Sequence, residues 1–133
     1  MTFESRHLSV RIDRPATEVY AFASNPANLP RWAPGLGSEV VHERGGWFVQ
    51  TPAGRARVTF APPNEYGILD HEVLTPAGEA VHVPLRVLTA GDGSEVVFTL
   101  RAAPGMTAAD LERDAALVTA DLQRLKRVLE GRP

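Results

Sequence analysis

The sequence contains no cysteine, which removes disulfides, thiol catalysis and thiolate metal ligands together and suits a reducing compartment. No dense basic run offsets the formal charge of -2, so nucleic acid is not an expected partner. No run of about 18 apolar residues occurs, and the start of the chain, Met-Thr-Phe-Glu-Ser-Arg-His, lacks the apolar centre of a secretion signal. We therefore expect a cytoplasmic protein without stable membrane insertion.

Motifs for metals and nucleotides are also missing. There is no His-Glu-x-x-His pattern, no phosphate-binding glycine loop that opens a helix, and no Gly-x-Ser-x-Gly elbow. We expect no metal and no cofactor. The 133 residues, of which 44% are apolar, are enough for one domain with a real core, so we expect a single domain over residues 1–133.

The longest predicted element is an amphipathic helix from Thr107 to about Glu130, where Thr107 and Asp110 form a capping box. Its apolar residues recur at alternating spacings of four and three and form one stripe: Leu111, Ala115, Val118, Leu122, Leu125 and Leu129. Such a helix must bury its stripe against a large partner.

The N-terminal part predicts a strand and two helices. His7 to Asp13 alternates apolar and polar residues, as in a half-buried strand. A helix follows from Arg14-Pro15, for which Asp13 is the expected cap. A second short helix runs from Pro26 to about Trp32, and a loop follows at Pro34-Gly35-Leu36-Gly37.

Most of the remaining sequence predicts short strands separated by strong turn signals: Ser38–Glu43, Gly46–Thr51, Arg55–Ala61, Gly67–Leu74, Glu79–Thr89 and Ser94–Arg101. Only this sheet is large enough to cover the apolar stripe of the last helix. The sequence therefore predicts an α+β fold in which a curved antiparallel sheet wraps round a long helix, an arrangement that often leaves a cavity.

Two of the turns have the same sequence, Thr-Pro-Ala-Gly, at residues 51–54 and 75–78. Each suits a three-residue hairpin loop with a bulge. For the second hairpin this register places Thr75 opposite Glu79 and His71 opposite Val83. Apolar and polar residues then separate onto opposite faces, with His71 as the single polar side chain on the apolar face. For the first hairpin the same reasoning pairs Gln50 with Ala56.

These registers predict the residues that line the cavity: His71, Gln50, Trp32, Phe48, Val58, Phe60, Leu69 and Val83. Trp32 is expected to close the mouth. An apolar lining with two polar groups, His71 and Gln50, suits a mostly apolar ligand that carries one or two polar groups.

His71 is the candidate catalytic residue because imidazole titrates near neutral pH. The alternative is a buried histidine satisfied by a backbone group or water. Asp70 is adjacent along the strand and points away, so an acidic partner would come from Asp114 or Asp121, which flank the apolar stripe of the last helix. Both also suit solvated positions at the helix edge, with Asp121 paired to Arg124. A metal site becomes conceivable only if a shifted register turns His71 and His82 to the same side.

With these residues placed, the chain resembles the SRPBCC superfamily, which includes START lipid-transfer domains and polyketide cyclase/dehydrase-like proteins. Ile12 to Tyr20 resembles the first strand and helix of that superfamily, and Asn28 to Trp32 resembles its short second helix. Further segments resemble small stand-alone bacterial members: 67–71, 98–101 and 121–126. The resemblance implies a helix-grip fold with seven antiparallel strands, two short helices and a long C-terminal helix over a pocket.

Three functions remain open at this point. The first is binding of a hydrophobic small molecule, such as a lipid or an aromatic or polyketide-like compound. The second is a cyclase or dehydratase-like enzyme that uses His71 as acid or base, with Gln50 polarising a carbonyl. The third is a protein-interaction module with a vestigial pocket. The sequence is compatible with a monomer or a homodimer.

Overall fold

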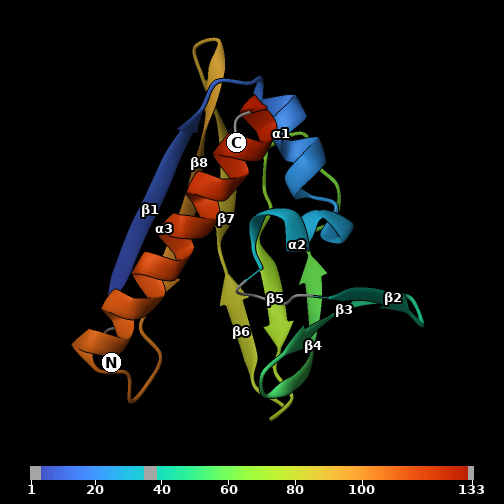
Figure 1. The fold of residues 1–133 in the computed structure, drawn as a ribbon, viewed down its shortest axis with the longest axis vertical. Coiled ribbons are helices and arrows are strands. Elements are labelled where there is room, and N and C mark those ends of the chain that lie inside the picture. The colour runs from blue at the N-terminus through green and yellow to red at the C-terminus, as the bar shows by residue number, and fades with distance from the viewer. Residues whose placement is uncertain (1–3, 35–38, 132–133) are drawn as a thin grey trace.

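The computed structural model describes residues 4–34 and 39–131, and these form two antiparallel sheets, one long helix and three short helical segments (Figure 1). The predicted loop at Pro34-Gly35-Leu36-Gly37 lies largely outside the described residues. The fold class is confirmed: a curved antiparallel sheet structure wraps one face of the C-terminal helix. Within the described residues, no helix combines the length and the apolar character needed to span a bilayer.

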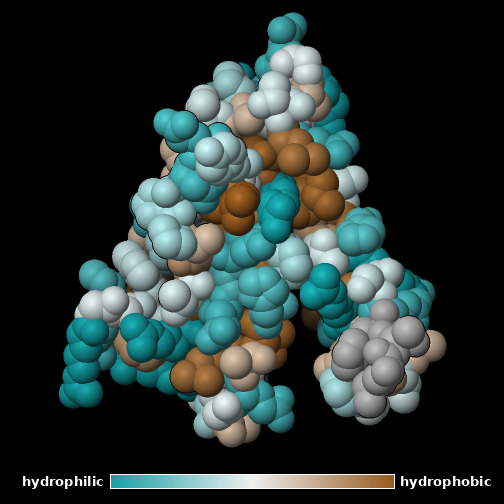
Figure 2. All heavy atoms as spheres, turned by 180° about the vertical axis from the view of Figure 1, so that it is seen from behind, coloured by the Kyte–Doolittle hydropathy of each residue, from teal (hydrophilic) through white to brown (hydrophobic). Residues whose placement is uncertain are grey.

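The three-stranded sheet has the order β1-β8-β7, with β1 at Ser5–Ile12, β7 at Leu85–Ala90 and β8 at Gly93–Arg101. Alternate residues of β1 face inward, as predicted: Val10 and Ile12 are buried, and Leu8 packs against the core. Seen from behind, the surface mixes hydrophilic residues with hydrophobic patches (Figure 2). The alternation therefore gives the sheet one apolar side, and helix α3 covers it.

Helix α3 (Ala108–Glu130) lies across β1 and β8. The predicted capping box is present, since the Thr107 hydroxyl accepts the Asp110 N–H at 3.1 Å and the Asp110 carboxylate accepts the Thr107 N–H at 3.0 Å. Gly131 ends the helix in the left-handed conformation, with φ of 71°. The predicted stripe faces the sheet: Leu111, Ala115, Leu122 and Leu125 are buried, and Val118 and Leu129 are partly buried against the core.

Two short helical regions follow β1 in the chain, and the second of them packs against α3 (Figure 1). Helix α1 is Ala16–Ala23, and the 3-10 turn η1 (Pro26–Asn28) leads into α2 (Leu29–Trp32). The predicted cap at Asp13 is wrong, because Pro15 occupies the cap position of α1 without a side-chain hydrogen bond. The backbone N–H of Asp13 instead donates to Glu130 at 2.8 Å, which ties the end of β1 to the end of α3.

The five-stranded sheet has the order β2-β3-β4-β5-β6, with β2 at Val40–Glu43, β3 at Gly46–Thr51, β4 at Gly54–Phe60, β5 at His71–Leu74 and β6 at Ala80–Val83. The described residues thus form eight strands rather than seven, because the predicted strand Glu79–Thr89 divides at Pro84 into β6 and β7. Proline has no N–H for a ladder hydrogen bond, so it marks the point where the two sheets separate.

The register predicted for the β5–β6 hairpin is confirmed. His71 lies opposite Val83, and the Thr75 N–H donates to the Glu79 carbonyl at 2.8 Å. Gly78 takes the left-handed conformation, with φ of 89°, that the bulged loop requires. His71 is therefore on the inner face, whereas His82 is on the outer face, 4.0 Å from Asp70.

The register predicted for the β3–β4 hairpin is wrong by one residue. Thr51 pairs directly with Gly54, so Val49 rather than Gln50 lies opposite Ala56. The observed register buries Val49, whereas the predicted one would bury the polar amide of Gln50 in its place. The burial preference of the strand outweighs the shared turn sequence, and Phe48 consequently moves to the outer face.

Candidate ligand-binding site

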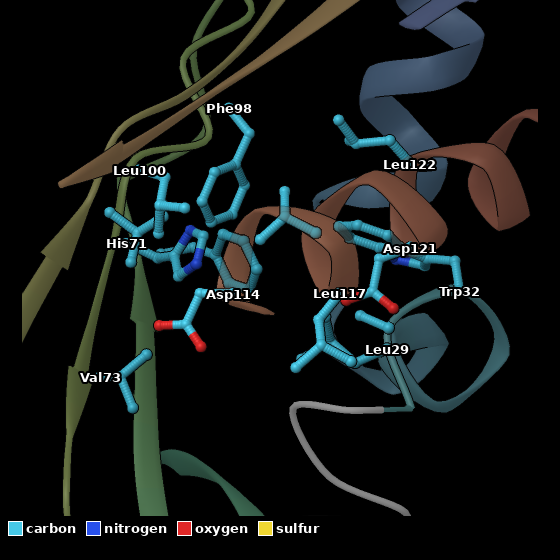
Figure 3. Close-up of a pocket in the computed structure, with 14 residues that line it drawn as sticks. Leu29, Trp32, His71, Val73, Phe98, Leu100, Asp114, Leu117, Asp121 and Leu122 are labelled. Atoms are coloured by element: carbon cyan, nitrogen blue, oxygen red, sulfur yellow. The ribbon is translucent and has the colours of Figure 1, made fainter. Parts of the chain in front are cut away.

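A cavity of about 230 Å³ lies between the inner face of the sheets, α2 and the middle of α3 (Figure 3). Ten of its fourteen lining residues are aliphatic or phenyl side chains: Leu29, Ala33, Phe60, Val73, Val83, Phe98, Leu100, Leu117, Val118 and Leu122. Its volume is below the roughly 300–1,000 Å³ typical of small-molecule sites. The cavity therefore suits a small apolar group, and a longer ligand would extend through its opening.

The molecule is hollowed at its lower end. Viewed from behind, the molecule has a deep notch between two lobes at its lower end (Figure 2). The β5–β6 hairpin lies in one lobe, and the start of α3 lies across from it (Figure 1). On α3, the cavity residue Leu117 is 56% exposed, which is unusual for a leucine and marks an accessible apolar edge.

His71 is the buried polar residue on the sheet side of the cavity, with only 8% of its surface exposed. Its Nδ1 lies 3.0 Å from the carbonyl oxygen of Leu69. Because a carbonyl only accepts, Nδ1 must carry the proton, which leaves a bare lone pair on Nε2. Burial lowers the pKa of His71 below its ordinary value of 6.5, although the Leu69 carbonyl opposes this. The imidazole is therefore a neutral hydrogen-bond acceptor at neutral pH.

The Phe60 ring fixes the other side of this imidazole. The two ring centroids are 5.0 Å apart and the planes are tilted by 41°. Phe60 and His71 are paired residues on β4 and β5, so the ladder brings the two rings together. The histidine is thus held by its strand, by one hydrogen bond and by an aromatic neighbour.

Two carboxylates enter the cavity from α3, at Asp114 and Asp121 (Figure 3). Their separation of seven residues, two helical turns, places them on one side of the helix. Asp121 accepts a hydrogen bond from Arg124 at 2.8 Å, as the sequence predicted. Burial nevertheless raises the pKa of Asp121, while the Arg124 hydrogen bond opposes the rise. Within the described residues, no hydrogen bond or ion pair engages the Asp114 carboxylate, which is half-buried.

Trp32 packs at the α2 side of the cavity, where 5% of its surface is exposed. Its indole N–H is buried and has no hydrogen-bond partner among the described residues. Its carbonyl accepts a hydrogen bond from Arg124 at 3.3 Å. The tryptophan is therefore linked through Arg124 to Asp121, and α2 is tied to α3 beside the cavity.

The predicted lining residues separate into two groups. Four of them line the cavity: Trp32, Phe60, His71 and Val83. The other four do not. Val58 and Leu69 are core residues, 2% and 1% exposed. Gln50 is exposed and bonds the Thr51 carbonyl at 3.3 Å, and Phe48 lies beside the guanidinium groups of Arg55 and Arg57.

Sequence reasoning missed the contribution of β8, which supplies Phe98 and Leu100. These residues continue the inward alternation from Val96, which is fully buried, so the period of two contains the signal. Sequence reasoning also left two positions possible for the carboxylates of α3, at the solvated edge of the helix or in the cavity. The structure places both Asp114 and Asp121 at the cavity.

A curved antiparallel sheet, a long C-terminal helix across it and an apolar cavity between them define a helix-grip protein, here of the SRPBCC superfamily. The sequence profile described as "Polyketide cyclase / dehydrase and lipid transport" matches residues 5–130. The chain therefore belongs to this family. No curated protein sequence matches it significantly.

Solved structures show the same fold at low sequence identity. The AHSA1-like protein from Rhizobium etli is 24% identical with a TM-score of 0.68, and the match covers 98% of this chain and 84% of that one. CalU16 from Micromonospora echinospora is 19% identical with a TM-score of 0.69, over 98% and 77% of the two chains. The Aha1 dimer from Colwellia psychrerythraea is 11% identical with a TM-score of 0.74, over 96% of each chain. These likenesses establish the fold alone.

Proposed function

We propose that this protein binds a small hydrophobic molecule in the cavity between its sheets and α3. The observation that carries the proposal is an apolar cavity of about 230 Å³ with one buried histidine whose Nε2 has no hydrogen-bond partner within the described residues. An apolar wall stabilises an apolar ligand body, and one fixed acceptor orients a ligand hydroxyl or N–H. The family description, which combines cyclase/dehydrase proteins with lipid transport, supports the same class of ligand.

Octanol is a suitable probe, because it combines a short alkyl chain with one hydroxyl. A ligand at 100 times its Kd raises the free energy of unfolding by about 2.7 kcal/mol, which a thermal melt detects. Val83→Phe would place a ring in the cavity and should abolish the octanol shift. Val81→Phe is the matched control, since Val81 is on the same strand and face, is 45% exposed and does not line the cavity.

The proposal fails if octanol leaves the melting temperature of the wild type unchanged at every concentration up to its solubility limit. It also fails if Val83→Phe and Val81→Phe respond to octanol equally while both fold. In that case the alcohol acts on the surface. A cavity that no hydrophobic compound enters would favour the interaction module with a vestigial pocket.

A second candidate is general-base catalysis in the same cavity, of the kind a cyclase or dehydratase needs. The specific observation is the tautomer of His71, in which the Leu69 carbonyl holds the proton on Nδ1 and leaves Nε2 free to accept one. Nitrobenzisoxazole tests this directly. A base removes its ring C–H proton, the N–O bond breaks and a nitrile-bearing phenolate forms, with no other reactant.

An active wild type that loses its rate in His71→Gln, with a rate that rises as His71 loses its proton, would support catalysis. A wild type that binds the compound without accelerating the reaction would leave binding as the function. His82→Gln is the control, because His82 lies on the outer face of the same hairpin.

A further inference from the structure

The side chains that line the cavity offer more hydrogen-bond acceptors than donors. The polar members are His71, Asp114, Asp121 and Trp32. Three of these present acceptors: a bare imidazole Nε2 and two carboxylates. Among the described lining residues, the single side-chain donor left is the indole N–H of Trp32, which is fully covered by protein atoms. The polar groups that this cavity offers to a ligand are therefore hydrogen-bond acceptors.

The charges of the side chains around the cavity are also not balanced. Arg124 is committed to Asp121 and to the Trp32 carbonyl, so this aspartate is already neutralised. Asp114 has no such partner within the described residues. His71 carries no charge at neutral pH, because burial opposes its protonation. One negative charge is left without a counter-charge on the α3 wall.

An uncompensated carboxylate beside an apolar cavity repels an anionic ligand and attracts a cationic one, and the low polarity of the surroundings strengthens both effects. A carboxylic acid would bring a second negative charge to Asp114 and would find no free cation on the lining residues that the structure describes. An ammonium group supplies the missing charge and several N–H donors.

From the cavity, the acceptor set and the unpaired Asp114 together, we infer that the ligand is a small hydrophobic amine, held with its apolar body against the sheet side and its ammonium group at Asp114. This inference rests on the proposed binding function and adds the chemical class of the ligand. His71 Nε2 and the free oxygen of Asp121 are the further acceptors that the ammonium group or a neighbouring hydroxyl would meet.

Three probes of equal chain length separate the alternatives: octylamine, octanol and octanoate, titrated at neutral pH. Trp32 reports binding by its fluorescence, and Trp47→Phe removes the other tryptophan, which stacks on His42 away from the cavity. Octylamine should bind at least about tenfold more tightly than octanoate, which corresponds to about 1.4 kcal/mol.

The variant that tests the assignment is Asp114→Asn, which keeps the size of the side chain and breaks no hydrogen bond within the described residues. It should remove most of the preference for octylamine over octanoate. Asp92→Asn is the matched control: Asp92 lies in the exposed turn between β7 and β8, so this variant changes the net charge equally, away from the cavity. The control should keep the preference.

Three results would overturn the inference, and they are distinguishable. Octanoate that binds as tightly as octylamine would refute the amine while leaving a hydrophobic-ligand function intact. Equal losses in Asp114→Asn and Asp92→Asn would assign the preference to the overall charge of -2. If none of the three probes changes Trp32 fluorescence or the melting temperature, the proposed function fails, and this inference fails with it.

Discussion

The Nδ1–H of His71 donates to the carbonyl of Leu69, two residues earlier in the chain, at 3.0 Å. This contact leaves Nε2 as the free nitrogen of a buried ring in an apolar cavity. Both the proposed binding function and the candidate catalytic role depend on this one relationship.

The first prediction concerns the contribution of His71 to ligand affinity. His71→Phe keeps a ring in the cavity but removes the Nε2 acceptor, so octanol should bind about three to ten times more weakly, as expected for one lost hydrogen bond. Isothermal calorimetry measures the affinity. His82→Phe, on the outer face of the same hairpin, should bind octanol as the wild type does. Unchanged affinity in His71→Phe would mean that Nε2 does not contact the ligand.

The second prediction concerns stability against pH. The pKa of His71 is lowered in the folded protein. Between pH 6.5 and this lowered pKa, the unfolded chain therefore binds a proton at His71 that the folded chain does not bind. The free energy of unfolding should therefore fall as the pH drops from 6.5 to the lowered pKa, by up to about 1.4 kcal/mol per pH unit. Urea denaturation at a series of pH values measures this.

His71→Gln should flatten the pH profile in that interval, whereas His82→Gln should retain its slope. The comparison isolates His71 from the other ionisable groups near it, which include Asp70 and His82 on the hairpin and Asp114 and Asp121 on the helix side. Parallel profiles for the wild type and His71→Gln would show that the ring is not kept neutral by burial.

The third prediction tests the register of the β3–β4 hairpin. Val49 is 1% exposed, so Val49→Ala should lower the free energy of unfolding by about 2 kcal/mol. Gln50→Ala should change it by less than about 0.5 kcal/mol, because the side chain is exposed. Thermal and urea unfolding give both values. A larger effect for Gln50→Ala would support the bulged register instead.

The fourth prediction concerns Gly67, which joins the β4–β5 connection to β7. It has a φ of 73°, its carbonyl accepts the Val87 N–H at 2.9 Å, and a Cβ atom there would run into the Val87 carbonyl. Gly78 also has a positive φ, 89°, but nothing lies within 4 Å of an added Cβ. Both Gly→Ala variants introduce backbone strain, and only Gly67→Ala adds a clash with the Val87 carbonyl.

Gly67→Ala should therefore be less stable than Gly78→Ala by about 1–3 kcal/mol, the usual range for overpacking. Equilibrium unfolding of the two variants under identical conditions measures the difference. Equal stabilities would show that β7 moves away from the connection at little cost.

Much of the fold follows from local patterns in the sequence. The stripe of α3, its capping box and the alternation of β1 each specify which face is buried, because a shift of one residue would expose the apolar set. The β5–β6 register was predictable for the same reason, since only one pairing separates apolar from polar residues around His71.

The β3–β4 register was not predictable from its turn, because an identical Thr-Pro-Ala-Gly sequence closes two different hairpins. The choice between Val49 and Gln50 as inward residue depends on the core that forms across from the strand. Likewise, the placement of Asp114 at the cavity depends on the angle at which α3 crosses the sheets, which no spacing of residues specifies.

The most direct test of the account is a proton–nitrogen correlation NMR spectrum of the histidine rings at a pH above 7 during titration with octanol. We expect His71 to carry its proton on Nδ1, and its Nε2 resonance to move with octanol and saturate while that of His82 stays fixed. A proton on Nε2, or a His71 resonance that does not move at any octanol concentration, would contradict it.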